Sequence, residues 1–307
     1  MKYVSLHHHS TFSYGDGFAL PREHVERAAT LGMTALALTE HGNLSSHVQL
    51  EKACNEFKIK PIFGLEGYIA APQENRKCHQ TILAMDQTGI RNLNAMVSQS
   101  WRDFYRWPTI HIDVLEEYSE GIIVLSGCAD STLSCTLLGG KSFGDKRDSY
   151  TREQFESAAR LVEWYQSVFD DRYYLECQRF PGLSRTRSLN PAFEKLSAIT
   201  GVGLVATSDC HYLYSRDAEM QKILHAAHRA STVSAVEASW EYSVTLDFPE
   251  SDEQVINDLV GTGLSDSAAQ SALDNTAIIA ERCNVVLPKV DPIRYPISEA
   301  DWAESWC

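Results

Sequence analysis

Short apolar runs alternate with amphipathic segments along the first two-thirds of the chain. A run bounded by turn residues predicts a buried strand, whereas apolar residues three and four positions apart predict a helix. Strands and helices then follow one another at the spacing of βα units, which is typical of a parallel sheet or barrel. The predicted strands are 3–6, 34–38, 61–64, 80–85, 121–125, 173–176 and 202–206, and the predicted helices are 21–31, 45–57 and 152–169.

Two more helices are predicted from capping signals near the C-terminus. A capping-box pattern at Ser251 precedes a helix over 251–260, and a second pattern at Ser267 precedes a helix over 267–283. We therefore expect an α/β chain whose sheet is followed by a helical extension. The predicted division is a barrel over 1–250, C-terminal helices packed on the barrel over 251–290, and a tail over 291–307.

The composition is that of a globular chain. The 307 residues are 44% hydrophobic and 22% charged, which suits one barrel or two small domains. No apolar run approaches the length of a membrane span, and the N-terminus lacks the pattern of a signal peptide. The eight cysteines contain no C-x-x-C pair, which argues against a zinc ribbon and a disulfide framework. We therefore expect a cytoplasmic protein with reduced thiols and no membrane partner.

The formal net charge of −14 works against extensive contact with duplex DNA, which requires a basic surface. It does not exclude a nuclease, because bound metal ions supply local positive charge that this count ignores. Carboxylates gathered to hold metals also make the net charge more negative.

Residues of the types that can bind metals follow the predicted strands. His7 and His9 end the first strand, and because side chains alternate faces they point the same way, with Cα atoms about 7 Å apart. Asp209 and His211 repeat this arrangement after the last strand. In parallel α/β folds the C-terminal ends of strands converge on the active site. Nine ligand-capable residues stand at or near such ends: His7, His9, Asp16, His41, Glu66, His79, Cys128, Asp209 and His211.

Each of these residues also has an ordinary structural explanation. One alternative is that His7, His8 and His9 are a tag remnant, and another is that Cys128 is a small buried hydrophobe. The corresponding explanation for His79 is the polar start of a strand, and that for Glu66 is a solvated acid in a loop. Placement of the whole set on successive strands is far beyond chance, so the sequence predicts a multinuclear metal centre.

The same segments carry a family resemblance. The chain resembles the PHP (polymerase and histidinol phosphatase) family, in particular the N-terminal PHP domain of bacterial DNA polymerase III alpha subunits. The match runs from Tyr3 to about Lys289. It is carried by LHHHSTFSYGDG (6–17), ALTEHGN (37–43), KPIFGLEGYIA (60–70), His79 with TILAMDQTGIRNL (81–93), GIIVLSGC (121–128), YYLECQR (173–179) and VATSDCHYL (205–213).

The resemblance implies a distorted (β/α)7 barrel of the PHP type with a trinuclear metal site. It places the metal positions of the family on the nine residues named above, each of which is a competent ligand. One departure is Glu40, where the family usually has Asp before the histidine, although the acid is retained. In the alpha subunits the domain is followed by several hundred residues of polymerase domains. Because this chain stops at Cys307, we expect no polymerase activity on length alone.

Mixed imidazole, thiolate and carboxylate ligands favour three Zn²⁺, Mn²⁺ or Fe²⁺ ions over Mg²⁺. Such ions generate hydroxide near neutral pH and stabilise displacement at phosphorus, so phosphoester hydrolysis is the expected reaction class. Arg179 and the basic loop over 141–152 are candidates for contacts with substrate phosphates, and a structural ion pair is the alternative for Arg179. His225 and His228 belong to no strand end and are not expected to be ligands.

Three functions stay open. The polymerase-type motifs favour a 3′–5′ exonuclease of the proofreading type, acting on a single-stranded or frayed DNA 3′ end. The second is a phosphatase for a small phosphomonoester, as in histidinol phosphatases, which needs a closed pocket rather than an open groove with stacking aromatics. The third is a non-enzymatic accessory subunit of a separately encoded replicative polymerase. The complete ligand set argues against this third function.

The C-terminal tail gives an indication of a partner. Trp302 and Trp306 lie four positions apart on a predicted terminal helix. They would dock on this domain or on another chain, and docking on this domain is favoured. We expect the tail to mark the point where a detached polymerase would have continued, an arrangement that suits a phage-like genome.

Overall fold

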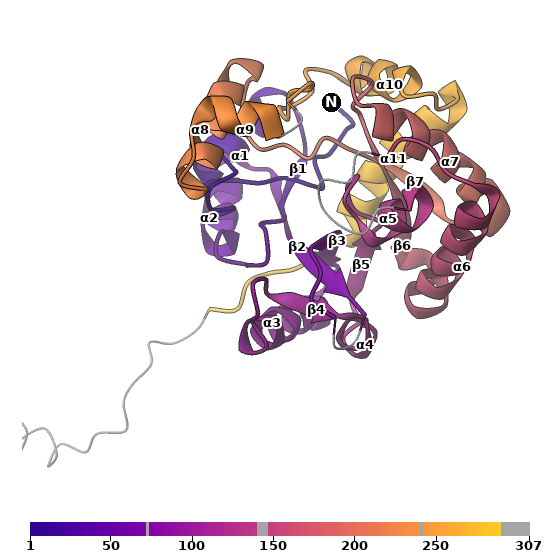
Figure 1. The fold of residues 1–307 in the computed structure, drawn as a ribbon. Helices are drawn as coiled ribbons and strands as arrows, with labels where there is room; N and C mark the ends of the chain where they lie inside the picture. Colours follow the sequence, from indigo (N-terminus) through magenta and orange to yellow (C-terminus); the bar gives the residue numbers. More distant parts are fainter. Residues whose placement is uncertain (72–73, 140–146, 240–241, 290–307) are drawn as a thin grey trace, which may run out of the picture.

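The computed structural model describes residues 1–71, 74–139, 147–239 and 242–289 (Figure 1). Its strands are β1 (Ala35–Leu38), β2 (Lys60–Ala70), β3 (Cys78–Ala84), β4 (Thr109–His111), β5 (Ile122–Leu125), β6 (Tyr173–Gln178) and β7 (Gly203–Thr207). Its α-helices are α1 (Pro21–Thr30), α2 (His47–Phe57), α3 (Gln87–Arg102), α4 (Ile112–Glu117), α5 (Thr132–Leu138), α6 (Arg152–Phe169), α7 (Ser184–Thr200), α8 (Ala218–His228), α9 (Val233–Ser239), α10 (Asp252–Gly261) and α11 (Asp266–Arg282). None of the helices in these ranges is both long and apolar enough to cross a membrane.

One sheet organises the fold, with the strand order β1-β2-β3-β5-β6-β7 and with β4 paired to β2. The expected parallel pairing holds for β1 with β2 and for β5, β6 and β7. It is wrong for β3, which runs antiparallel to both β2 and β5. The described residues between β2 and β3, which are 71 and 74–77, contain no crossover helix, and β3 lies beside β2 in the opposite direction.

The N-terminal segment joins the two edges of this sheet. The expected strand over 3–6 is reduced to isolated bridges, which pair Ser5 with Leu36 and His8 with Cys210. The His9 amide donates to the carbonyl of Cys210 at 2.7 Å, beyond the end of β7, and the Thr39 amide donates to the carbonyl of His8 at 2.9 Å, beyond the end of β1. With this irregular segment as the seventh member, the strands β1, β2, β3, β5, β6 and β7 complete a ring, so the distorted α/β barrel is confirmed.

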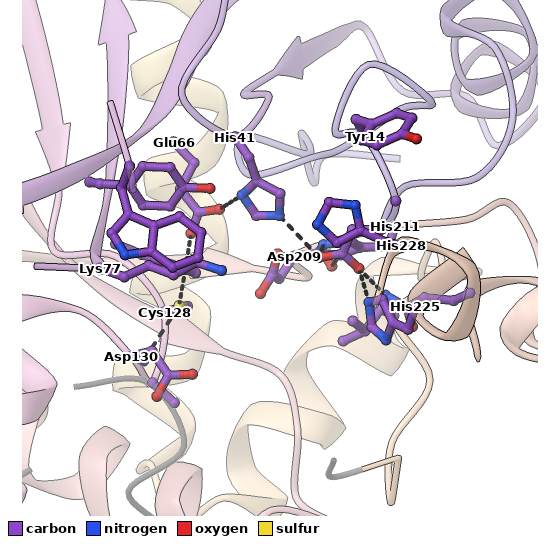
Figure 2. Close-up of a pocket in the computed structure, with 18 of the residues that line it drawn as sticks. Tyr14, His41, Glu66, Lys77, Cys128, Asp130, Asp209, His211, His225 and His228 are labelled. Carbon is purple, nitrogen blue, oxygen red and sulfur yellow. Dashed lines mark hydrogen bonds and ion pairs between the residues drawn. The ribbon is translucent and has the colours of Figure 1, made fainter. Parts of the chain in front are cut away.

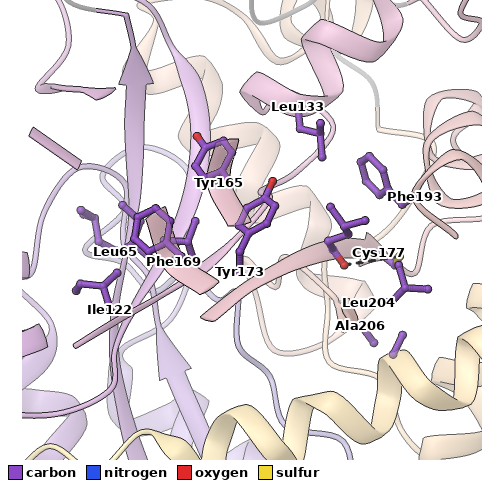
Figure 3. Packing of buried hydrophobic residues seen from close by; sticks show 14 of the residues in the cluster. Leu65, Ile122, Leu133, Tyr165, Phe169, Tyr173, Cys177, Phe193, Leu204 and Ala206 are labelled. Carbon is purple, nitrogen blue, oxygen red and sulfur yellow. Dashed lines mark hydrogen bonds between the residues drawn. The ribbon is translucent and has the colours of Figure 1, made fainter. Parts of the chain in front are cut away.

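Helices cover the outside of this ring. In Figure 1, α1, α2, α8 and α9 lie on one side of the strands, and α6 and α7 lie on the other. On the α6 side, Tyr165 stacks on Tyr173 with ring centroids 4.6 Å apart and an interplanar angle of 7° (Figure 3). Phe169 and Phe193 are fully buried in the same cluster, and aromatic side chains of this size contribute heavily to the hydrophobic stabilisation of a core. This packing of the outer helices stabilises the strands that carry the ligand-capable residues.

The C-terminal helices pack on the barrel. Asn275 of α11 donates to the carbonyl of Leu204 in β7 at 2.7 Å, and Thr276 accepts from the amide of Val4 at 3.0 Å. The cap expected at Ser267 is wrong, because Ser265 accepts from the Ala268 amide and starts α11 two residues earlier. The cap at Ser251 is confirmed for α10. The predicted tail over 291–307 lies outside the described residues.

Candidate metal centre

The nine ligand-capable residues of the sequence lie in one cluster at one edge of the barrel. Most follow a strand, but Glu66 lies within β2, which continues to Ala70. His79 is the second residue of β3, and because β3 runs antiparallel its start lies at the edge where β2 ends, with His79 opposite Tyr68. Figure 2 shows Glu66 and His41 side by side, with Asp209 and His211 across the pocket from Glu66.

Three sets of donor atoms within this cluster have the spacing of metal ligands. In each set the donor atoms lie within 4.8 Å of one another, and Glu66 and His9 each belong to two sets. The sets are His9, His41 and His211; His7, His9 and Glu66; and Glu66, His79 and Cys128.

Each of the two aspartates lies close to two histidines of one set. Asp209 Oδ1 lies 3.3 Å from His7 Nε2 and 3.4 Å from His9 Nε2. Asp16 Oδ2 lies 3.2 Å from His41 Nε2 and 3.6 Å from His211 Nε2. The Gly15-Asp16-Gly17 turn therefore returns a carboxylate over the pocket.

Several of these donor atoms have no hydrogen-bond partner although they are buried. They include Nε2 of His7, Nε2 of His9 and Oδ1 of Asp209. Buried polar atoms without partners are costly, so a cluster of them aimed at a common space is a site for a bound ion. Imidazole, thiolate and carboxylate donors together fit borderline divalent metals such as Zn²⁺, Mn²⁺ or Fe²⁺.

The charges in the cluster support one another. Burial alone raises the pKa of Glu66, but the fields of His79 and His7 outweigh burial, so the pKa lies well below its ordinary value. Burial lowers the pKa of His7, and the nearby carboxylates of Asp209 and Glu176 outweigh it, so this pKa lies well above its ordinary value. The carboxylate thus stays charged, as a metal ligand must be.

A buried carboxylate beneath the cluster orients His7. Glu176 Oε1 lies 2.6 Å from His7 Nδ1, and the same carboxylate accepts from the hydroxyls of Thr81 and Thr207, each at 2.8 Å. Glu176 accepts at Nδ1, so when His7 is neutral, as a metal ligand must be, its remaining proton stays on Nδ1 and the lone pair of Nε2 faces the cluster.

His9 is oriented in a similar way. The Ser13 hydroxyl donates to Glu40 at 2.6 Å and lies 2.8 Å from His9 Nδ1. Because the Ser13 hydroxyl donates its hydrogen bond to Glu40, its oxygen accepts from Nδ1 of His9. Nε2 of His9 then faces the cluster. Glu40 also accepts from the amide and hydroxyl of Ser10. The acid that departs from the family pattern therefore supports this loop.

Helix α8 adds contacts that the sequence did not predict. His225 Nε2 lies 2.7 Å from Asp16 Oδ1, and Gln221 donates to the same oxygen at 2.8 Å. The other ring nitrogen of His225 lies 2.6 Å from the Tyr242 hydroxyl. His225 belongs to none of the three sets, and it contacts Asp16, so the prediction that it is not a ligand stays a prediction. The sequence signal for this contact was the pair His225 and His228, three positions apart on one helix.

The cluster opens into a cavity of about 660 Å³. Lys77 and Cys128 lie on one side of it, and Tyr14, His225 and His228 lie on the other (Figure 2). Aromatic residues also line the cavity: Phe12, Tyr14, Tyr68, Trp101, Phe104, Trp107, Phe180 and Tyr242. A site with polar groups at its floor and aromatic walls suits a ligand that has both phosphate and apolar parts.

The expected contact between Arg179 and substrate phosphate is wrong. Arg179 is buried, does not line the cavity, and forms an ion pair with Asp258 at 2.9 Å. It also donates to the Ser208 hydroxyl at 2.8 Å and to the carbonyl of Asp247 at 2.5 Å. These partners occupy the guanidinium on every side, so the structural alternative holds. In the basic loop, Lys141 and Lys146 lie outside the described residues.

We expect Arg179→Ala to lower the free energy of unfolding by about 3 kcal/mol, because it leaves Asp258 and the Asp247 carbonyl without their partner. Chemical denaturation followed by circular dichroism measures this. Arg160→Ala on α6, which removes an exposed arginine, is the matched control and should change stability by less than about 0.5 kcal/mol. Equal stability of the two variants would contradict the structural role of Arg179.

Fold and site together define an α/β barrel with a histidine-carboxylate cluster at one edge of its sheet. Residues 5–180 match the PHP domain, which is more than half of the chain. The chain therefore belongs to the PHP family.

Curated relatives are DNA polymerase III alpha subunits. The subunit of Thermus aquaticus is 30% identical over 97% of this chain, and that of Deinococcus radiodurans is 31% identical over 94%. The aligned regions are 24% and 21% of those proteins, so the chain spans about a quarter of their length.

Solved structures with a similar fold are more distant. A histidinol phosphate phosphatase from Lactococcus lactis, complexed with zinc, L-histidinol and phosphate, is 17% identical with a TM-score of 0.35, over 76% of this chain and 94% of that one. An amidohydrolase from Chromobacterium violaceum is 16% identical with a TM-score of 0.38, over 68% and 87%. At these values the likeness does not bear on function.

Proposed function

We propose that this protein is a metal-dependent phosphoesterase with three divalent metal ions, and that it removes nucleotides from DNA 3′ ends. The observation that carries the proposal is the set of three adjoining ligand groups that share Glu66 and His9. Their shared members would hold neighbouring ions close enough for joint action on one phosphate. Zn²⁺, Mn²⁺ or Fe²⁺ fit these donors.

Bound metal ions in such a site lower the pKa of water and neutralise charge on the phosphoryl oxygens. The residues of the chain do the remaining work. Glu176 and Ser13 fix the rings of His7 and His9, so that the donor atoms are already placed before substrate arrives. Lys77 lines the cavity beside the Glu66, His79 and Cys128 set and supplies a positive charge for a substrate phosphate.

The wall of the cavity favours a nucleic acid over a small phosphomonoester. Aromatic side chains that line the cavity offer flat surfaces on which bases stack. The alpha subunits that resemble this chain act on DNA as their name states, which supports the same choice. A proofreading-type 3′–5′ exonuclease follows as the proposed activity.

The test is turnover of a 5′-labelled single-stranded oligonucleotide beside p-nitrophenyl phosphate, with Mn²⁺ or Zn²⁺. We expect a ladder of shortened labelled products from the wild-type protein and none from the His9→Ala, Asp209→Ala double variant. Hydrolysis of the monoester with an intact oligonucleotide would overturn the exonuclease and indicate a phosphatase. No turnover of either substrate, with metal bound, would leave an accessory role for a polymerase.

We expect His225→Ala to weaken metal binding by about tenfold to a hundredfold, because outer partners of a ligand have effects of this size. The variant frees Asp16 from the contact at 2.7 Å that holds it over His41 and His211. Calorimetric titration of metal-free protein with Zn²⁺ measures the change. His228→Ala removes a histidine from the same helix and the same cavity, and its affinity should stay within about twofold. Equal losses in both variants would contradict a specific role for His225.

A further inference from the structure

Exposed aromatic side chains gather at one place on the surface. In the part of the chain that the structure describes, the large aromatic side chains that are exposed to solvent are Tyr14, Trp101, Phe104, Tyr105 and Trp107. All but Tyr105 line the cavity above the metal centre, and residues 101–107 form one continuous stretch that begins in the last turn of α3. Such a concentration at a site entrance marks a binding surface.

Two of these rings form a ready-made stack. Trp101 and Phe104 lie with centroids 5.3 Å apart and an interplanar angle of 6°. Trp101 is fixed at its edge, because its indole nitrogen donates to the carbonyl of Gly42 at 2.8 Å, directly after His41. About half of Trp101 is exposed, at 52%. The stack is therefore held rigidly against the loop that carries a ligand of the metal centre.

Positive charge lies beside the aromatic rings. The Lys77 ammonium is 4.6 Å from the centroid of Trp107 and 5.7 Å from that of Tyr68. Arg106, which also lines the cavity, has a φ of +67°, a conformation that residues other than glycine rarely adopt. A bridge between Tyr105 and Trp107 holds this turn. Flat rings with cations beside them match the alternation of bases and phosphates along a single strand.

We propose that Trp101, Phe104 and Trp107 form a stacking platform for the bases of single-stranded DNA, with Lys77 and Arg106 contacting its phosphates. This inference rests on the proposed function, since it assigns to the platform the nucleotides that precede the phosphodiester at the metal centre. A duplex presents no free base faces, so the platform selects single strands and frayed ends. It also provides a contact to DNA in a chain whose net charge is −14, because stacking depends less on charge.

The test measures binding without turnover. Fluorescence anisotropy follows a 5′-fluorescein oligodeoxythymidylate of about 12 nucleotides with metal-free protein in EDTA. The Trp101→Leu, Phe104→Leu double variant keeps apolar bulk but removes the aromatic faces, and its affinity should fall about tenfold or more. Ile199→Ala, which removes exposed apolar surface from α7 outside the cavity, should bind as the wild type does. Thermal melting checks that each variant is folded.

A blunt hairpin duplex, used as a second probe, should bind more weakly than the single strand. Equal affinity of the double variant and the wild type for the single strand would overturn the platform and assign this aromatic surface to a protein partner. No binding of the single strand by the wild type would also overturn it. Either result is separate from failure of the exonuclease proposal, which is read from the ladder of products in the presence of metal.

Discussion

Glu66→Gln should abolish metal-dependent hydrolysis, with a loss of more than about a hundredfold, beyond the range typical of outer partners of a ligand. Glu66 has one oxygen 2.6 Å from His41 Nδ1 and the other 2.9 Å from His79 Nδ1, and it belongs to two of the three donor sets. The amide keeps the size of the side chain but removes the negative charge. Two of the three donor sets therefore lose the member that they share in one substitution.

The measurement is the initial rate on a labelled oligonucleotide with saturating Mn²⁺. Glu163→Gln on α6 makes the same chemical change at an exposed position and should retain full activity. A Glu66→Gln protein that is folded by circular dichroism and hydrolyses DNA at the wild-type rate would show that the cluster is not the site of the reaction.

Removal of metal by a chelator should lower the melting temperature by roughly 5–10 °C. A ligand that binds only the folded state at a hundred times its dissociation constant stabilises a protein by about 2.7 kcal/mol, and the melting temperature shifts by about 2–4 °C per kcal/mol at this size. Nε2 of His7, Nε2 of His9 and Oδ1 of Asp209 are buried without a hydrogen-bond partner, and a bound ion would supply one. Calorimetric melting before and after EDTA measures the shift.

The His9→Ala, Asp209→Ala double variant is the control for this experiment. The two donor sets that include His9 are lost in this variant, and only the set of Glu66, His79 and Cys128 remains. EDTA should therefore lower its melting temperature by less than it lowers that of the wild type. In the wild-type protein treated with EDTA, added Zn²⁺ or Mn²⁺ should restore the melting temperature. Mg²⁺ should not restore it, since imidazole donors bind Mg²⁺ poorly. An identical response to EDTA in both proteins would mean that the chelator acts elsewhere.

Much of the centre was predictable because ligand type and strand position coincide in the sequence. His7 with His9 and Asp209 with His211 stand beside apolar runs, and a sheet brings such ends together. The α/β ring followed from the same periodicity. The antiparallel direction of β3 did not, because an apolar run carries no information about the direction in which a strand is inserted.

Contacts that depend on helix packing could not be predicted. His225 reaches Asp16 only because α8 lies against the Gly15-Asp16-Gly17 turn, and nothing local to residue 225 specifies this. Arg179 was misassigned for a related reason. A cation after a strand end is typical of phosphate binding, but Asp258 on α10 and the carbonyl of Asp247 meet its side chain from distant parts of the sequence. Tertiary contacts decide both cases.

The content of metal per chain tests the central proposal most directly. Elemental mass spectrometry of protein loaded with Zn²⁺ or Mn²⁺ and then dialysed should give about three ions per chain, one for each donor set. The His9→Ala, Asp209→Ala variant should retain no more than about one, at the set formed by Glu66, His79 and Cys128. Wild-type protein that retains no more metal than this variant would contradict the account.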